Sequence, residues 1–164
     1  PIDSYVEAYE AITSGKADVV YPYGDGNYQY QVFADDELVT HFLTQDFDFT
    51  SLERKSKVYD AKYGFCQFFN RNVYIKGGLE NENFVAYAPE DVERFYRFKT
   101  LGYNILRIPS HVYHLEHARS PNSWFTNPHM NQNNEEWERV QRMDKDTLKE
   151  YIESQDYYRS RIGG

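Results

Sequence analysis

The chain has 164 residues, which is enough for one domain of ordinary size and too few for two independent cores. Aromatic residues make up 18% of it, which excludes disorder as a description of the whole chain, because disordered sequences are poor in aromatic residues. Eighteen Lys and Arg against 26 Asp and Glu give a net charge of −8, which repels a phosphate backbone, so we expect no nucleic-acid partner.

The first third of the chain predicts helices and strands in alternation. Apolar and aromatic residues from Tyr5 to Ile12 fall at helical spacing, Ser4 can cap the start, and Gly15 follows the end. Residues 28–32 alternate Tyr or Val with Gln, the period of a half-buried strand. The predicted elements are a helix over 4–14, strands over 18–23 and 28–32, and helices near 36–43 and 50–56 within an acidic stretch.

The rest of the chain begins with an aromatic run and ends in a charged helix. Pro89 can sit in the first turn of a helix that Gly102 closes, and Gly77 with Gly78 forms a sharp turn. The predicted elements are a short helix or turn over 70–78, a helix over 89–102, strands over 103–108 and 112–115, a loop over 118–134, and a terminal helix over 135–158 broken near Asp144.

The chain shows no internal repeat and no linker, so residues 1–164 are expected to form a single α+β domain with a small mixed sheet flanked by helices. No apolar run is long enough to cross a bilayer, and no signal peptide opens the sequence. Cys66 is the single cysteine and cannot form an internal disulfide, which favours a cytoplasmic location. The start at Pro1 instead of Met indicates a piece of a longer protein.

Glu90 and Asp91 stand at the start of the helix predicted after Pro89, and two interpretations are open. Carboxylates at a helix N-terminus complement the macrodipole and cap free N–H groups, so the pair can be purely structural. Alternatively, one carboxylate is a general base beside a sugar, with Phe84 and Tyr87 as rings on which the sugar stacks.

Three of the five histidines lie within seven residues, at His111, His114 and His117. On the predicted strand His114 points away from the other two, so a single cluster of three zinc ligands is awkward. One histidine joining carboxylates around Mn²⁺ or Mg²⁺ is easier, since both ligand types suit manganese. The alternative is a structural or surface role for each histidine, and Cys66 is expected to be a buried small apolar residue.

Five segments resemble, in order and spacing, the acceptor-side half of GT-A glycosyltransferases. They are YGFCQFF at 63–69, GGLENENF at 77–84, YAPEDVERFYRF at 87–98, LGY at 101–103 and YHLEHAR at 113–119. The resemblance covers residues 61–119 and is to family-two enzymes and to the C-terminal part of galactosyltransferases. It implies a partial GT-A fold with a C-terminal helix.

The resemblance also implies roles for individual residues. Asp91 would be the base that deprotonates the acceptor hydroxyl, and Glu90 beside it would bind the acceptor sugar. Tyr87 stands where the family usually has Trp and would stack on that sugar. His117 matches the metal ligand of galactosyltransferases, whereas His114 matches that of bacterial polymerase-like relatives, and both stay open. Gly77 and Gly78 would hold the loop where donor and acceptor meet, and Phe84 and Trp124 would add to the sugar-stacking surface.

The expected activity is transfer of a sugar, with inversion, from a nucleotide-sugar such as a UDP-sugar to a glycan acceptor, with Mn²⁺ or Mg²⁺ on the diphosphate. The family's nucleotide-binding half and its Asp-x-Asp motif should precede the matched region, so we expect this chain alone to be inactive. Without that half, a sheet face near 19–23 and 65–69 would be exposed and favour self-association. The alternative is a glycan-binding or scaffold domain without catalysis.

Overall fold

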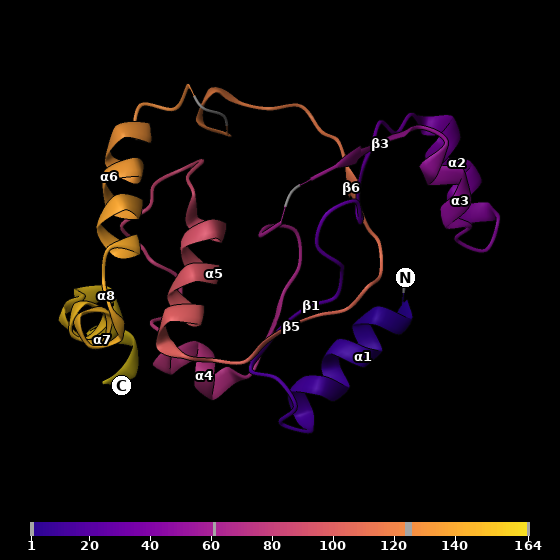
Figure 1. Cartoon of the computed structure of the whole chain (residues 1–164). Coiled ribbons are helices and arrows are strands. Elements are labelled where there is room, and N and C mark those ends of the chain that lie inside the picture. Colours follow the sequence, from indigo (N-terminus) through magenta and orange to yellow (C-terminus); the bar gives the residue numbers. More distant parts are fainter. Residues whose placement is uncertain (1, 61, 124–125, 164) are drawn as a thin grey trace.

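The computed structural model describes residues 2–60, 62–123 and 126–163. Short strands alternate with helices through this part of the chain (Figure 1). The strands are β1 (Val19–Tyr21), β2 (Gln29–Val32), β3 (Ser56–Tyr59), β4 (Phe68–Phe69), β5 (Ile105–Arg107) and β6 (Val112–Leu115). The helices are α1 (Ile2–Thr13), α2 (Asp36–Thr44), α3 (Phe49–Glu53), α4 (Arg71–Lys76), α5 (Glu90–Leu101), α6 (Met130–Gln141), α7 (Lys145–Ser154) and α8 (Asp156–Ile162), with a 3₁₀ turn, η1, at Pro121–Ser123.

Two three-stranded sheets organise the fold, where we expected one small sheet. In the first sheet β1 is central, antiparallel to β4 and parallel to β5, so that Val19 pairs with Phe69 on one side and Ile105 on the other. In the second sheet β2 is central, antiparallel to β3 and parallel to β6. Each sheet therefore joins an early strand to a late one, and the prediction of an α+β fold with small mixed sheets is confirmed.

The central strand β1 is buried, which shows that the expectation of an exposed sheet face at residues 19–23 is wrong. Val19, Val20 and Tyr21 are at most 2% exposed. The alanines of α1 are small enough to let this helix pack closely on Val20, while Phe98 of α5 joins the cluster that contains Val19 and Tyr21. Because both faces of β1 are covered within the chain, this strand offers no apolar surface to a second copy.

Some elements differ from the sequence-based predictions. Strand β3 was not predicted: it begins where the helix predicted near 50–56 ends, pairs with β2 and leaves three of its four side chains exposed, so it carries no apolar alternation. Helix α6 begins at Met130, inside the predicted loop over 118–134. The terminal helix over 135–158 is divided as predicted at Asp144, whose carboxylate caps α7, and again at Gln155.

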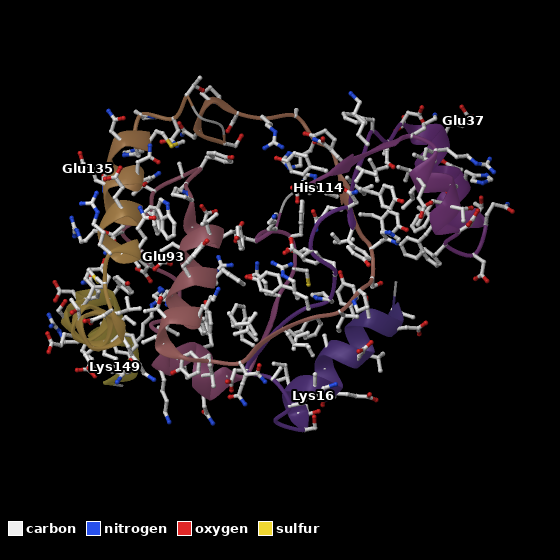
Figure 2. All side chains as sticks on the ribbon, in the orientation of Figure 1. Lys16, Glu37, Glu93, His114, Glu135 and Lys149 are labelled. Atoms are coloured by element: carbon white, nitrogen blue, oxygen red, sulfur yellow. The ribbon has the colours of Figure 1, made fainter. Side chains whose placement is uncertain are left out.

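A buried ion pair fixes α5 against the turn that follows α4. Arg97 and Glu93 lie one helical turn apart, are at most 2% exposed, and are joined by a 2.7 Å contact from Nε to Oε1. Arg97 also donates to the carbonyls of Gly77 and Leu79. Figure 2 shows Glu93 between α5 and the C-terminal helices, whereas Glu135 projects from the outer side of α6. The pair thereby helps to fix the position of α5.

The helices flank the sheets at opposite ends of the molecule. Helix α6 lies beside α5, and α7 and α8 lie below α6 (Figure 1). Their core contains Leu101, Val140, Leu148, Ile152 and Tyr158. At the other end α2 and α3 cover the second sheet through a smaller cluster of Val32, Leu38 and Leu52.

Candidate functional site

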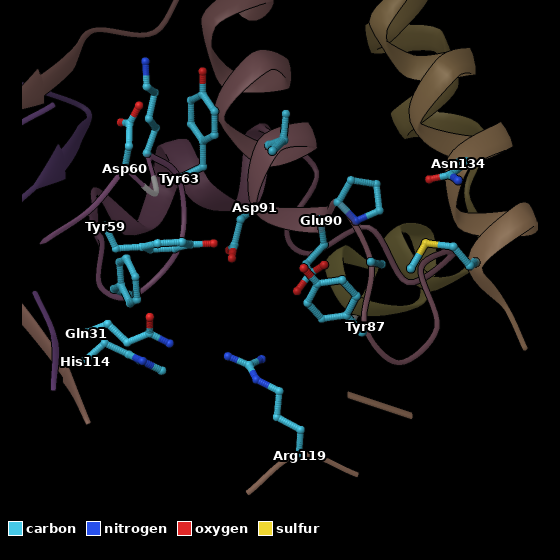
Figure 3. Close-up of a pocket in the computed structure, with 17 residues that line it drawn as sticks. Gln31, Tyr59, Asp60, Tyr63, Tyr87, Glu90, Asp91, His114, Arg119 and Asn134 are labelled. Atoms are coloured by element: carbon cyan, nitrogen blue, oxygen red, sulfur yellow. The ribbon is translucent and has the colours of Figure 1, made fainter. Parts of the chain in front are cut away.

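A cavity of about 920 Å³ opens between the second sheet, the first turn of α5 and the start of α6 (Figure 3). Charged, polar and aromatic side chains form its walls. Four predicted site residues meet here: Tyr87, Glu90, Asp91 and His114. The complete lining is Gln31, Tyr59, Asp60, Lys62, Tyr63, Gly64, Phe65, Tyr87, Ala88, Pro89, Glu90, Asp91, Val92, His114, Arg119, Met130 and Asn134.

Asp91 reaches the cavity with one carboxylate oxygen held by an arginine. Oδ1 accepts from Arg94 Nη1 at 2.9 Å, and Arg94 is itself held by Glu80 at 3.0 Å and by Gln67 at 2.5 Å. The other oxygen, Oδ2, lies beside Gly64, where a methyl group would stand only 2.9 Å away. Burial raises the pKa of Asp91, and the charge of Arg94 opposes that rise. The side chain keeps 38% of its surface exposed, so it is open to a ligand.

Glu90 has no charged partner of this kind. Its Oε2 is buried and makes no hydrogen bond to any residue in the described ranges. Burial is the main reason that its pKa is raised, and the neighbouring Asp91 charge adds to the rise. An unsatisfied buried acceptor costs about 1–3 kcal/mol, so Glu90 is held in this position at a cost in stability. Figure 3 shows the Glu90 carboxylate next to the Tyr87 ring.

Aromatic rings line much of the remaining wall. Tyr59 is the exposed last residue of β3, and the Tyr63 ring packs against Phe95 of α5 with centroids 4.8 Å apart. Phe65, which we expected on an exposed sheet face, is 40% exposed and lies 5.2 Å from the His114 ring. Rings beside carboxylates and an arginine suit a ligand with both apolar faces and hydroxyl groups.

His114 and His117 have different positions relative to the cavity. The two rings are 5.7 Å apart, but only His114 lines the cavity; His117 Nδ1 contacts the Ala118 carbonyl at 3.0 Å. Burial lowers the pKa of His114 and keeps its imidazole neutral at physiological pH. Glu116 accepts from Gln31 in the same region.

A metal site is not visible in the described part of the chain: no three side chains of His, Cys, Asp or Glu there come together as ligands. His114 lies at the end of the cavity near Gln31, whereas Asp91 and Glu90 lie across it in Figure 3. His114, Asp91 and Glu90 therefore do not form a set of ligands for one metal ion. Binding of Mn²⁺ or Mg²⁺ through His114 or His117 stays a prediction.

Three other predicted residues lie elsewhere. Gly77 and Gly78 are buried against Phe98, Arg97 and Ile152, where they close the turn after α4 and do not line the cavity. Phe84 is partly buried and is likewise absent from the lining. Trp124 lies outside the described residues.

The cavity contains residues that our sequence reasoning did not select. Tyr59 and Gln31 come from strands β3 and β2, which the fold brings beside His114 of β6. Asn134 lies in α6. Arg119 carried a usable signal, since it ends the YHLEHAR segment, and its charge lowers the pKa of Tyr87 against the larger effect of burial. The other residues depend on pairing between distant strands and on packing of α6 beside α5, which local patterns do not reveal.

The fold and this cavity define the class of protein coarsely, as an α+β domain with a cavity lined by carboxylates, cations and tyrosines. Comparisons with family models, with curated proteins and with solved structures found no match to the chain. Among the residues that the structure describes, no helix is long and apolar enough to span a membrane.

Proposed function

We propose that this chain forms the acceptor side of an inverting glycosyltransferase that uses a nucleotide-sugar, such as a UDP-sugar, and a glycan acceptor. One observation carries the proposal: Asp91 and Glu90, two consecutive carboxyl groups with raised pKa, meet the Tyr87 ring in one cavity. Perturbed carboxylates in a cavity are candidates for acid–base chemistry. The resemblance of residues 61–119 to GT-A enzymes supplies the reaction type.

Asp91 is the general base in this proposal. It takes the proton of the acceptor hydroxyl while that oxygen attacks the anomeric carbon, and the bond from this carbon to the diphosphate breaks on the opposite side, which inverts the configuration. Burial makes the Asp91 carboxylate a better proton acceptor than in water, whereas the charge of Arg94 favours its ionised form.

Glu90 and Tyr87 bind the acceptor in this proposal. The Glu90 carboxyl group, which lines the cavity, binds a sugar hydroxyl, and the Tyr87 ring packs on the apolar face of the sugar. Arg119 lies in the same cavity and adds a donor to the polar part of the site.

The test substitutes Asp91→Asn, which keeps the size of the side chain and removes the base. In a longer polypeptide that includes the expected nucleotide-binding half, this change should reduce transfer from UDP-sugars to oligosaccharides by a factor of about 10³ or more, with acceptor affinity retained. Asp146→Asn in the first turn of α7, 88% exposed, is the matched control and should transfer normally. Normal turnover by the Asp91→Asn variant would remove the catalytic assignment.

A glycan-binding domain without catalysis is the second candidate. The observation that favours it is the Arg94 contact to Asp91, since an ion-paired carboxylate is also well suited to hold a sugar hydroxyl. In that case Asp91→Asn would weaken acceptor binding, and the wild-type sequence would transfer no sugar in the longer polypeptide.

A further inference from the structure

The backbone of Tyr87 is held on both sides by three asparagines, Asn122, Asn127 and Asn133. Its N–H donates to the Asn122 carbonyl at 3.0 Å. Its carbonyl accepts from two side chains, Asn127 Nδ2 at 2.6 Å and Asn133 Nδ2 at 3.1 Å. Because two of these three contacts come from side chains, the position of Tyr87 depends on the identity of those residues.

The side chain of Asn133, which lies on α6, forms hydrogen bonds with main-chain groups of this loop, as the backbone of a neighbouring strand would. Its Oδ1 accepts from the Val85 N–H at 3.0 Å, and its Nδ2 donates to the Val85 carbonyl at 2.8 Å as well as to Tyr87. The side chain is fully buried. A buried amide is costly unless its groups are paired, and here both polar atoms are used on the loop.

The residue between the two bonded positions is strained. Ala86 has a φ of 60°, the left-handed region that a residue with a Cβ rarely adopts. Such a conformation persists only where the surroundings enforce it, and Asn133 bonds to the main chain of both neighbours, Val85 and Tyr87. Asn133 itself does not line the cavity, whereas Tyr87 does.

We propose that Asn133 is a positioning residue, which holds Ala86 in its strained conformation and thereby presents the Tyr87 ring to the cavity. The effect of Asn133 on sugar binding rests on the proposed function, in which Tyr87 stacks on the acceptor sugar. The conformational part of the inference does not depend on the ligand and is tested separately.

The conformational test is amide hydrogen exchange at Tyr87. Asn133→Asp keeps the size and the acceptor oxygen but turns the donor into an oxygen that faces two carbonyls. We expect exchange at the Tyr87 amide to become at least about tenfold faster, because the loop opens more often. Asn131→Asp, the same charge change on the exposed side of α6, is the matched control and should leave the rate unchanged. An unchanged rate in Asn133→Asp overturns the proposal.

Two further variants keep the test decisive. If Asn133→Asp does not fold, as judged by circular dichroism, Asn127→Ser removes one donor to Tyr87 and should also speed exchange there. Ala86→Gly added to Asn133→Asp should restore part of the protection, since glycine adopts a φ of 60° without strain. The proposal fails if Asn127→Ser leaves the exchange rate at Tyr87 as in the wild type and if Ala86→Gly leaves it as in the Asn133→Asp variant. In that case the strain at Ala86 does not depend on these asparagines.

The ligand test uses methyl β-D-glucoside and methyl β-D-galactoside, with binding followed by saturation-transfer NMR. We expect Asn133→Asp to weaken binding at least about fivefold and Asn131→Asp to leave it unchanged. Equal affinity in both variants overturns the presenting role of Asn133. If the wild-type chain binds neither these sugars nor any member of a glycan array, it is the proposed function that fails, and the exchange result alone decides whether Asn133 holds the loop.

Discussion

At the scale of single residues, the two consecutive carboxylates at the start of α5 have different environments. Asp91 is paired with Arg94, whereas the buried Oε2 of Glu90 has no hydrogen-bond partner in the described ranges. Both have a raised pKa because burial outweighs the favourable contacts. An unsatisfied buried acceptor costs stability in the free protein.

Glu90→Gln should stabilise the chain at pH 7 by about 1 kcal/mol, since it removes a charge that burial disfavours. A carboxyl whose folded pKa is raised contributes stability that is complete below its unfolded pKa, near 4.5, and is lost as pH rises through the folded pKa. The advantage of the Gln variant should therefore shrink as pH falls through the folded pKa of Glu90 and be lost below about pH 4.5. Urea unfolding between pH 4 and pH 8 measures this difference.

The control for this measurement is Glu135→Gln on the exposed side of α6, for which we expect less than about 0.5 kcal/mol at any of these pH values. A Glu90→Gln variant that is less stable than wild type at pH 7 would show that the ionised carboxylate is favoured at this position. That result would contradict the raised pKa of Glu90, which means that the ionised form is disfavoured.

At the scale of elements, the turn after α4 packs against both α5 and α7. Gly78 has a φ of 97°, and a Cβ there would lie 3.0 Å from both Arg97 Nη1 and Ile152 Cγ1. The close approach lets Arg97 reach the carbonyls of Gly77 and Leu79 while Glu93 neutralises its charge. Gly77 and Gly78 therefore allow the close packing of α5 and α7. The sequence predicts instead that these two glycines hold the loop where donor and acceptor meet.

Gly78→Ala should lower the free energy of unfolding by about 2–4 kcal/mol, because it adds close contacts to an unfavourable φ. Gly26→Ala is the matched control: its φ is 87°, but a Cβ there meets nothing within 4 Å, so it should cost only about 1–2 kcal/mol. The difference between the two variants in chemical denaturation measures the packing at α7. Equal costs would mean that α7 yields to the added methyl group.

At the scale of the whole molecule, each sheet depends on a late strand. Strand β1 pairs in parallel with β5, and β2 pairs in parallel with β6, so both central strands have one neighbour from beyond residue 104. Parallel pairing of this kind needs a long crossover, and the sheets cannot form from the first hundred residues alone.

A fragment of residues 1–102 should therefore show no cooperative thermal transition by circular dichroism, because it lacks β5, β6 and the helices that cover α5. A fragment of residues 1–154 is the control: it keeps both sheets and loses α8, including the buried Tyr158, so it should melt cooperatively at a lower temperature. Cooperative melting of the shorter fragment would show that the first 102 residues form a core of their own.

The sequence by itself determined the local elements whose side-chain patterns are strong. Helix α5 starts after Pro89 and ends at Gly102, which adopts the left-handed conformation of a helix C-cap. Strand β2 shows its alternation of Tyr or Val with Gln, and Asp144 marks the break before α7. These signals lie within a few neighbouring residues, so the physics that produces them is local.

Only the tertiary structure decided which residues share the cavity. Asp91, Tyr87 and His114 were selected from the sequence, but Tyr59 and Asn134 join them through pairing of β3 with β2 and packing of α6 beside α5. Packing of α1 and α5 buries β1, and the two glycines after α4 pack against α5 and α7 and do not line the cavity. These outcomes depend on contacts between residues far apart in the chain, and no periodicity or short motif encodes which distant segments will meet.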